Sequence, residues 1–233
     1  MEDTLLEKVE YTAVNGGFTT SQERIVKETA LTIRVNGEHY ATAMIMATLK
    51  KEFVTGYLFS QGIINDAADI TSLNFNGNIA DVVLSRPINR KEDIPAVNSA
   101  LIVRKEDVFD CVRAILKSEI FAETEAVHSA GLFVNGTETI CIAEDLGRHN
   151  ALDKVIGYGL LNNIDFSNTL AASTGRQPSE MIIKCRNAGI PIIATKGVPT
   201  TMAIEIAKKA GIAIAGLVRG STMMVYSTPA RIV

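Results

Sequence analysis

Three short apolar runs in the second half of the chain alternate with segments that favour helix, and this alternation constrains the fold most strongly. Pro178 and Pro199 each open a helical segment, where we expect them at the first helical position, and Gly189 marks the end of the first segment. Buried strands that alternate with helices predict a layered α/β domain with a partly parallel sheet. The three runs are TLAAS (169–173), PIIAT (191–195) and IAIAGLV (212–218).

Asn-Gly dipeptides predict three β-hairpins, at Asn36-Gly37, Asn76-Gly77 and Asn135-Gly136. Helical spacing of apolar residues predicts one helix over 49–62, between the first two hairpins, and another over 106–117. We therefore divide the chain near the second helix. Residues 1–103 are expected to form a hairpin-helix-hairpin region, and residues 104–233 are expected to form the α/β domain.

Charge and cysteine content exclude several classes of protein. The chain has 23 basic and 26 acidic residues, so it has no overall attraction for nucleic acid or anionic lipid, and any anion site must be local. Its three cysteines are widely spaced in apolar runs, as buried thiols are in a reducing compartment. The start, MEDTLLEKVE, lacks a signal pattern, and no stretch reaches the ~20 apolar residues that cross a bilayer. We expect a cytoplasmic protein without nucleic-acid or membrane partners.

Polar clusters follow several of the predicted strands. In a parallel sheet, ligands bind beyond the carboxyl ends of the strands, where helix N-termini present free N–H groups. Three of the clusters contain groups that bind anions, so the sequence predicts a composite site for a phosphorylated ligand, in particular a nucleotide. The clusters are EDLGRHN (144–150), STGR (173–176), VPTT (198–201) and GLVRGST (216–222).

Each cluster also has a purely structural interpretation. Asp145 would cap the helix that follows it, and Asp153 with Lys154 would lie on the solvated surface of that helix. Thr200 would satisfy the N–H groups of its own helix start, and residues 216–222 would form a plain β-turn. At this level both interpretations stay open.

The order and spacing of these motifs resemble the formate dehydrogenase accessory sulfurtransferase family (FdhD, also called NarQ). The resemblance extends into the first half of the chain, where residues 35–64 look like the hairpin and helix of the family. The matching motifs of the second half are EDLGRHNALDKVIG (144–157), STGRQPSEM (173–181), PTTMAIEIA (199–207) and GLVRGSTMMVY (216–226).

This resemblance implies a cytidine-deaminase-like three-layer α/β/α domain with a smaller N-terminal α/β region, usually as a homodimer. It implies that sulfur is taken from a cysteine desulfurase as a persulfide and passed to the molybdenum of a bis(molybdopterin guanine dinucleotide) cofactor, which is then inserted into formate dehydrogenase. A GDP-like nucleotide is a second expected ligand.

By matching motifs, the cofactor-binding stretch of the family falls on one turn of this chain, and the other strand-end turns would form walls of the same pocket. The stretch consists of Leu217, Val218, Arg219, Gly220, Ser221 and Thr222. The walls consist of His128, Arg148, His149, Asn150, Gly175, Arg176, Thr200 and Thr201.

The chain departs from the family pattern in two places. Where the family has its sulfur-carrying C-G-x-C-G loop, residues 85–103 form a shorter segment without cysteine. No other side chain both accepts and donates sulfane sulfur as a thiolate does, and Cys111, the nearest cysteine and only a weak catalytic candidate, is expected on an apolar helical face. His128 matches a T-G-x-x-H-x-A motif, but Glu125 and Ala126 replace its small lead residues.

Two functions therefore stay open. The chain is either an accessory protein that binds the cofactor and supports its sulfuration, or a non-catalytic paralogue that binds a guanine nucleotide or cofactor and has lost sulfur transfer. A zinc deaminase, which the fold alone suggests, needs H-x-E and P-C-x-x-C motifs, and the sequence contains neither. Its histidines and cysteines do not group as zinc ligands, so we expect no bound metal.

Overall fold

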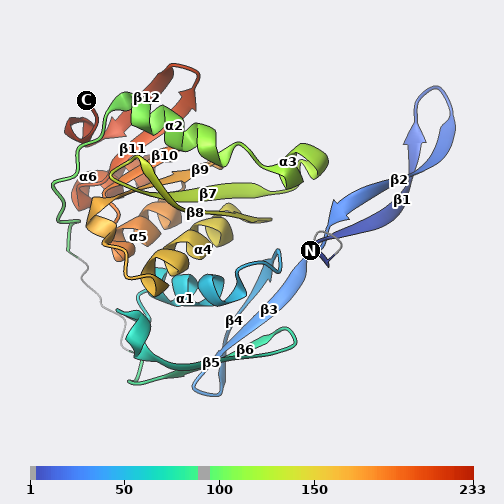
Figure 1. The fold of residues 1–233 in the computed structure, drawn as a ribbon, viewed down its shortest axis with the longest axis horizontal. Helices are drawn as coiled ribbons and strands as arrows, with labels where there is room; N and C mark the ends of the chain where they lie inside the picture. The colour runs from blue at the N-terminus through green and yellow to red at the C-terminus, as the bar shows by residue number, and fades with distance from the viewer. Residues whose placement is uncertain (1–3, 89–94) are drawn as a thin grey trace.

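The computed structural model describes residues 4–88 and 95–233, and within them the chain forms three sheets with helices packed around the largest (Figure 1). The predicted N-terminal hairpins and helix are confirmed. Strands β3 (Thr29–Val35), β4 (Glu38–Ile45), β5 (Ile70–Asn76) and β6 (Ile79–Leu84) form a sheet of order β4-β3-β6-β5, and helix α1 (Lys50–Ser60) follows β4.

An additional hairpin precedes this sheet. Strands β1 (Leu6–Val14) and β2 (Phe18–Val26) pair antiparallel around Asn15-Gly16. This Asn-Gly dipeptide precedes the three for which the sequence predicts hairpins, and no hairpin is predicted there. The hairpin projects away from the rest of the molecule (Figure 1).

The second half contains the predicted α/β domain. Its sheet has the order β12-β11-β10-β9-β7-β8, and β9, β10 and β11 are parallel, as the alternation of strand and helix predicts. The strands are β7 (His128–Val134), β8 (Glu138–Asp145), β9 (Thr169–Ser173), β10 (Ile192–Thr195), β11 (Ala213–Arg219) and β12 (Thr222–Ser227). The helices are α2 (Lys105–Ile115), α3 (Glu119–Thr124), α4 (Arg148–Leu161), α5 (Ser179–Ala188) and α6 (Thr201–Ala210), with 3₁₀ turns at Ala67–Asp69, Phe166–Asn168 and Pro229–Arg231.

Helices cover both faces of the six-stranded sheet, which confirms the three-layer α/β/α class. Alternate residues of β9 show the two faces: Leu170 and Ala172 belong to the apolar cluster that includes α2, whereas Ala171 belongs to the cluster of α4, α5 and α6. Because successive side chains of a strand point to opposite faces, the near-continuous apolar runs of β9, β10 and β11 supply both cores.

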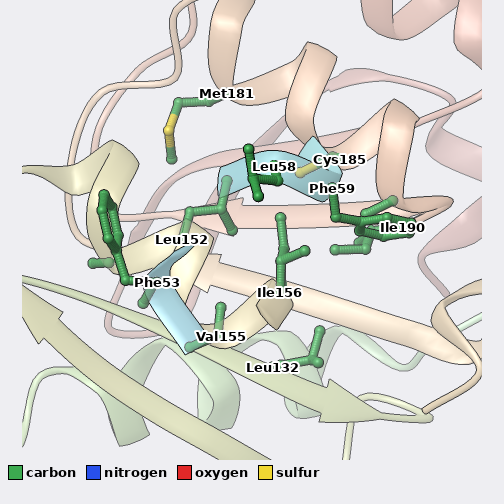
Figure 2. Close-up of a cluster of buried hydrophobic side chains, with 14 of the residues drawn as sticks. Phe53, Leu58, Phe59, Leu132, Leu152, Val155, Ile156, Met181, Cys185 and Ile190 are labelled. Carbon is green, nitrogen blue, oxygen red and sulfur yellow. The ribbon is translucent and has the colours of Figure 1, made fainter. Parts of the chain in front are cut away.

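Helix α1 of the N-terminal region packs into the second of these cores. Phe53, Leu58 and Phe59 of α1 lie among Leu152, Val155 and Ile156 of α4 (Figure 2). The helices cross at Gly56 and Gly157, where a Cβ on either residue would overlap the backbone of the other helix. The proposed regions 1–103 and 104–233 therefore share one apolar core.

The prediction that each proline is the first residue of a helix is wrong, by one residue for Pro178 and by two residues for Pro199. Helix α5 begins at Ser179 with Pro178 as its N-cap, and α6 begins at Thr201 with Thr200 as its N-cap. Both prolines lie before their helices because the two turns run side by side, joined by a parallel bridge between Gln177 and Pro199. Extended backbone is needed for that pairing.

None of the helices in the described residues is long and apolar enough to cross a membrane.

Candidate functional site

The strand ends that the sequence singled out lie at one edge of the six-stranded sheet (Figure 1). The last residue of β9, Ser173, pairs with the last residue of β10, Thr195, because these strands are parallel. Strand β7 runs antiparallel to β9, so its first residue, His128, lies at the same edge, opposite Asp145 at the end of β8. Helices α4, α5 and α6 all begin here, so their N-termini face one region.

The turn after β9 brings His128 and Arg148 together. His128 Nδ1 lies 3.2 Å from Thr174 Oγ1, which also accepts a hydrogen bond from Ser129 N. Arg148 packs over Gly175 so closely that a Cβ at Gly175 would lie 2.6 Å from Arg148 Cδ. Gly175 is therefore required for the close approach of this guanidinium side chain to the turn.

Hydrogen bonds lock this turn to its two neighbours. Thr195 Oγ1 donates to the carbonyl oxygen of Gly175 over 2.6 Å, and Gln177 N donates to Val198 O over 2.9 Å. Leu217 N donates to Gly197 O over 2.8 Å, which joins the start of the 217–222 stretch to the turn after β10. The three turns thus form a preorganised edge.

Two of the remaining residues in the first cluster lie close to neighbouring elements. His149 Nε2 lies 3.2 Å from Glu180 Oε2, at the start of α5, but forms no hydrogen bond among the described residues. Asn150 Nδ2 donates to Met44 O and to Asp145 Oδ1, both over 2.8 Å, so this amide connects β4 to the strand-end turn. Asn150 therefore has a structural role.

Burial lowers the pKa of both His128 and His149, and the positive charge of Arg148 lowers each pKa further. Both imidazoles are consequently neutral at pH 7. The positive charge beside Gly175 belongs to Arg148, and the two histidines supply hydrogen-bonding groups without charge.

Several buried polar atoms at this edge have no hydrogen-bond partner among the described residues. They include Arg148 Nε, Ser173 Oγ and Gln177 Oε1. Roughly nine in ten or more of the buried polar groups in proteins have a hydrogen-bond partner. Unpaired atoms from three elements at one edge therefore point to a polar ligand.

A cavity of about 290 Å³ opens beside His128. Ile115, Leu116, Phe121 and Val127 supply apolar walls, whereas His128, Thr174 and Lys196 supply polar groups. An apolar cavity with a few convergent polar groups suits a flat organic ring joined to an anionic group.

The structure does not bring every predicted residue into this arrangement. Arg176 and Arg219 are exposed, and the described residues show no hydrogen bond or ion pair from either guanidinium. Thr222 Oγ1 donates to Arg219 O across the turn between β11 and β12, where residues 219–222 are exposed.

The two threonines at the start of α6 belong to the helix itself. Thr200 Oγ1 accepts a hydrogen bond from Ala203 N and so caps α6, as the structural interpretation predicts. Thr201 is the exposed first residue of that helix.

The structural interpretation of Asp153 and Lys154 is wrong, because both residues are fully buried. Lys154 Nζ lies 2.7 Å from Asp145 Oδ2, and Lys184 Nζ lies 2.8 Å from both carboxylate oxygens of Asp153. Asp145 is also not the N-cap of α4, which is Gly147, because its carboxylate is committed to Lys154. The one available signal is that apolar residues flank the Asp153-Lys154 pair on both sides in the helix.

The ion pairs fix the strand-end turn to the N-terminal sheet. Asp145 Oδ2 accepts from Met46 N, and Lys154 Nζ donates to Met46 O and Thr48 Oγ1. Burial lowers the pKa of Lys154, an effect that the charge of Asp145 opposes. Two segments therefore depend on the buried ion pair between Asp145 and Lys154. One is the link between β4 and α1, and the other is the turn that holds Arg148.

None of the three thiols is suited to carrying sulfur. Burial raises the pKa of Cys111 and Cys185 to about 12 and that of Cys141 to about 11. Cys111 Sγ also donates to Gly136 O over 3.0 Å. The thiolate is the nucleophile in persulfide formation, and these values leave almost none at neutral pH. Residues 89–94, in the segment that replaces the cysteine loop, lie outside the described residues, as do residues 1–3 of the N-terminus.

We predict that the folded protein, incubated with a cysteine desulfurase and cysteine, gains no sulfur adduct of about 32 Da by intact-mass spectrometry. As the control, a thiol reagent should detect three free thiols in the denatured protein, which would show that the cysteines are reduced and react once they are accessible. A persulfide on Cys111 would show that the chain is a sulfurtransferase with a relocated nucleophile.

We also predict that purified protein contains no stoichiometric zinc by elemental analysis. In residues 4–88 and 95–233, no three His, Cys, Asp or Glu side chains group as metal ligands. One zinc per chain would overturn this prediction.

The chain is similar to known proteins over most of its length. A sulfur carrier protein FdhD from Methanothermobacter thermautotrophicus is 34% identical over 232 residues, covering 91% of this chain and 92% of that protein. One from Geobacillus kaustophilus is 31% identical over 247 residues, covering 94% of each. The crystal structure of a "putative formate dehydrogenase accessory protein" from Desulfotalea psychrophila matches with a TM-score of 0.88 at 28% identity, over 98% of this chain and 100% of that one.

The model of the FdhD/NarQ family matches residues 26–99 and 88–233, which include the strand-end turns and the sheet that presents them. The fold, the order of the motifs and the similarity over nearly the whole length agree. The chain therefore belongs to the FdhD/NarQ family.

Proposed function

We propose that this protein supports formate dehydrogenase maturation by binding the molybdenum bis(molybdopterin guanine dinucleotide) cofactor, as cargo, at the strand-end edge. Its relatives are named sulfur carrier proteins FdhD, and its structural neighbour is described as a formate dehydrogenase accessory protein. The proposed setting is the cytoplasm, with formate dehydrogenase as the recipient of the cargo.

The observation that supports binding is the set of unpaired buried polar atoms, Arg148 Nε, Ser173 Oγ and Gln177 Oε1, beside the interlocked turns. A guanine dinucleotide offers phosphate oxygens to a guanidinium and to helix N-termini, and flat rings to the cavity beside His128. Arg148 and the turn at Gly175 would hold phosphate, and the 217–222 stretch, which is exposed from Arg219 to Thr222, would extend the surface toward the rest of a ligand much larger than the cavity. These residues fit the group.

The cysteines do not fit sulfur transfer, the other activity that the family resemblance implies. A persulfide carrier needs an accessible thiol of low pKa, and Cys111, Cys141 and Cys185 all have raised pKa values. This observation favours the second candidate function, in which the chain holds the cofactor or a guanine nucleotide without carrying sulfur. A cysteine desulfurase is a partner only under the first.

Isothermal titration calorimetry of the full chain with GDP and with ADP tests the proposal. We expect tighter binding of GDP. The Arg148→Ala and Arg219→Ala variants should each lose about 1.5–3 kcal/mol of binding free energy, the size of a hydrogen bond to a charged group. Arg113→Ala is a matched control and should leave affinity unchanged, since among the described residues Arg113 pairs only with exposed Asp110 on α2. Equal affinities for GDP and ADP, or no binding of either, would contradict the proposal.

A further inference from the structure

The two adjacent acids at the end of β8 face opposite sides of the sheet and differ in their partners. Asp145 is fully buried on the side of α4, where Lys154 Nζ and Met46 N bind its carboxylate. Because successive side chains of a strand alternate between faces, Glu144 lies on the other side, where it lines a groove together with Ile115 of α2. Lys154 Nζ reaches the backbone carbonyl of Glu144, over 2.9 Å. The buried ion pairs therefore account for Asp145 but not for the carboxylate of Glu144.

The carboxylate of Glu144 has a buried oxygen without a partner. Among the described residues, no group donates a hydrogen bond to Glu144 Oε1. A buried polar atom that lacks its hydrogen bond costs free energy, and a group that supplies this bond away from water is held strongly. Because an ionised carboxylate only accepts hydrogen bonds, the partner that Glu144 lacks is a donor.

The groove lined by Glu144 adjoins the candidate site. It has a volume of about 390 Å³, and it shares the lining residues Ile115, Ser118 and Ser129 with the cavity beside His128. A ligand in that cavity can therefore extend into the groove. There the free oxygen of Glu144 would meet a donor group at the edge of the ligand.

The pairing of three strands sets the separation of Glu144 from the proposed phosphate site. Glu144 pairs with Ser129 of β7, and Ser129 N donates to Thr174 Oγ1 in the turn after β9. Neighbouring strands lie about 4.8 Å apart, so roughly 10 Å separates the backbone at Glu144 from the backbone at Thr174. Thr174 precedes Gly175, over which Arg148 packs. A ribose separates the ring of a nucleotide from its phosphates, so one nucleotide can place phosphate at Arg148 and the edge of its ring at Glu144.

We propose that Glu144 selects the ring of the ligand by accepting hydrogen bonds from the ring N–H and the amino group of a 2-amino-4-oxopyrimidine edge. Guanine presents these two donors side by side, and the two oxygens of a carboxylate match them. Adenine presents an unprotonated ring nitrogen there, and the carboxylate repels its lone pair. A site with a buried group that must be paired discriminates strongly against a ring that leaves it unpaired. This inference rests on the proposed function and names the residue that gives the site its preference for guanine.

Isothermal titration calorimetry of the full chain with GDP, IDP and XDP tests the selection. IDP lacks the 2-amino group, so wild type should bind GDP roughly 10- to 100-fold more tightly than IDP, the ratio for one hydrogen bond to a charged group. XDP carries an oxygen in place of the amino group and should bind wild type more weakly than IDP does. In Glu144→Gln the amide can donate to that oxygen, so XDP should become the preferred ligand. A gain of affinity for XDP cannot result from misfolding.

Glu119→Gln is the matched control for the loss of negative charge. Glu119 is an exposed acid that lines the same groove, so its replacement should leave the preference for GDP over XDP unchanged. An equal change of preference in Glu119→Gln and Glu144→Gln would assign the effect to the charge of the groove, and it would overturn a direct role for Glu144.

The molybdopterin cofactor carries the same donor edge in its pterin rings, and 6-carboxypterin distinguishes this source from guanine. If Glu144 binds the pterin, Glu144→Gln should weaken binding of 6-carboxypterin by about 10-fold or more and leave the preference for GDP over XDP unchanged. If neither the nucleotide preference nor the affinity for 6-carboxypterin changes, the inference is overturned, while binding of GDP would still support the proposed function. Wild type that binds neither GDP nor 6-carboxypterin would reject both.

Discussion

Gly157→Ala is expected to lower the free energy of unfolding by about 3 kcal/mol or more. A Cβ at this position would overlap the carbonyl oxygen of Glu52 and lie 2.7 Å from Gly56 N. Both contacts are to backbone, so no side-chain rotation can relieve them, and α1 and α4 would have to separate in the centre of the shared core (Figure 2). Overpacking of this kind costs more than the roughly 1 kcal/mol that Gly→Ala otherwise gains in a helix.

Urea denaturation followed by circular dichroism measures this loss, and Gly159→Ala is the matched control on the same helix. A Cβ at Gly159 would meet side-chain atoms, Leu132 Cδ2 at 2.8 Å and the Phe166 ring at 2.9 Å. These groups can shift, so we expect a smaller loss. Equal stability of Gly157→Ala and wild type would contradict the close crossing of α1 and α4.

Lys154→Met should destabilise the fold by about 3–5 kcal/mol, the cost of leaving one partner of a buried ion pair unpaired. The substitution keeps the apolar stem of the side chain but leaves the fully buried carboxylate of Asp145 without its cation. It also removes the hydrogen bonds to Met46 O and Glu144 O. Because the same turn presents Arg148, affinity for GDP should fall together with stability.

Two further variants isolate the contribution of the buried charge. Arg113→Met breaks an exposed pair with Asp110, and surface pairs contribute only about 0–1 kcal/mol. Asp145→Asn combined with Lys154→Met should recover part of the stability, since no buried charge is then left alone. If Lys154→Met were no more destabilising than Arg113→Met in thermal and urea denaturation, the buried pair would not have the role assigned to it.

Features set by local chemistry were predictable from the sequence. Asn-Gly dipeptides located three hairpins, and alternating apolar runs identified the parallel strands β9, β10 and β11. The β1-β2 hairpin was missed because the residues around Asn15-Gly16 are exposed on both faces and show no buried pattern.

Features that depend on distant partners were not predictable. An Asp-Lys dipeptide on a helix usually lies at the surface, and only the fold shows that Asp153 meets Lys184 and that Lys154 meets Asp145. The N-cap position of Pro178 follows from the pairing of two turns that are distant in the sequence, through the bridge between Gln177 and Pro199. The strand-end positions of His128, Arg148 and Gly175 were expected, but their contacts come from the packing of α4 against the turn after β9.

We propose that the strand-end edge holds a guanine dinucleotide cofactor through Arg148. Native mass spectrometry of the full chain, purified from cells grown with molybdate, tests it most directly when wild type, Arg148→Ala and the Arg113→Ala control are compared. We predict a bound species with the mass of the molybdenum guanine dinucleotide cofactor or a guanine nucleotide on wild type and Arg113→Ala, and its loss from folded Arg148→Ala. Wild-type protein free of any guanine-containing species, or equal loading of Arg148→Ala, would contradict the claim.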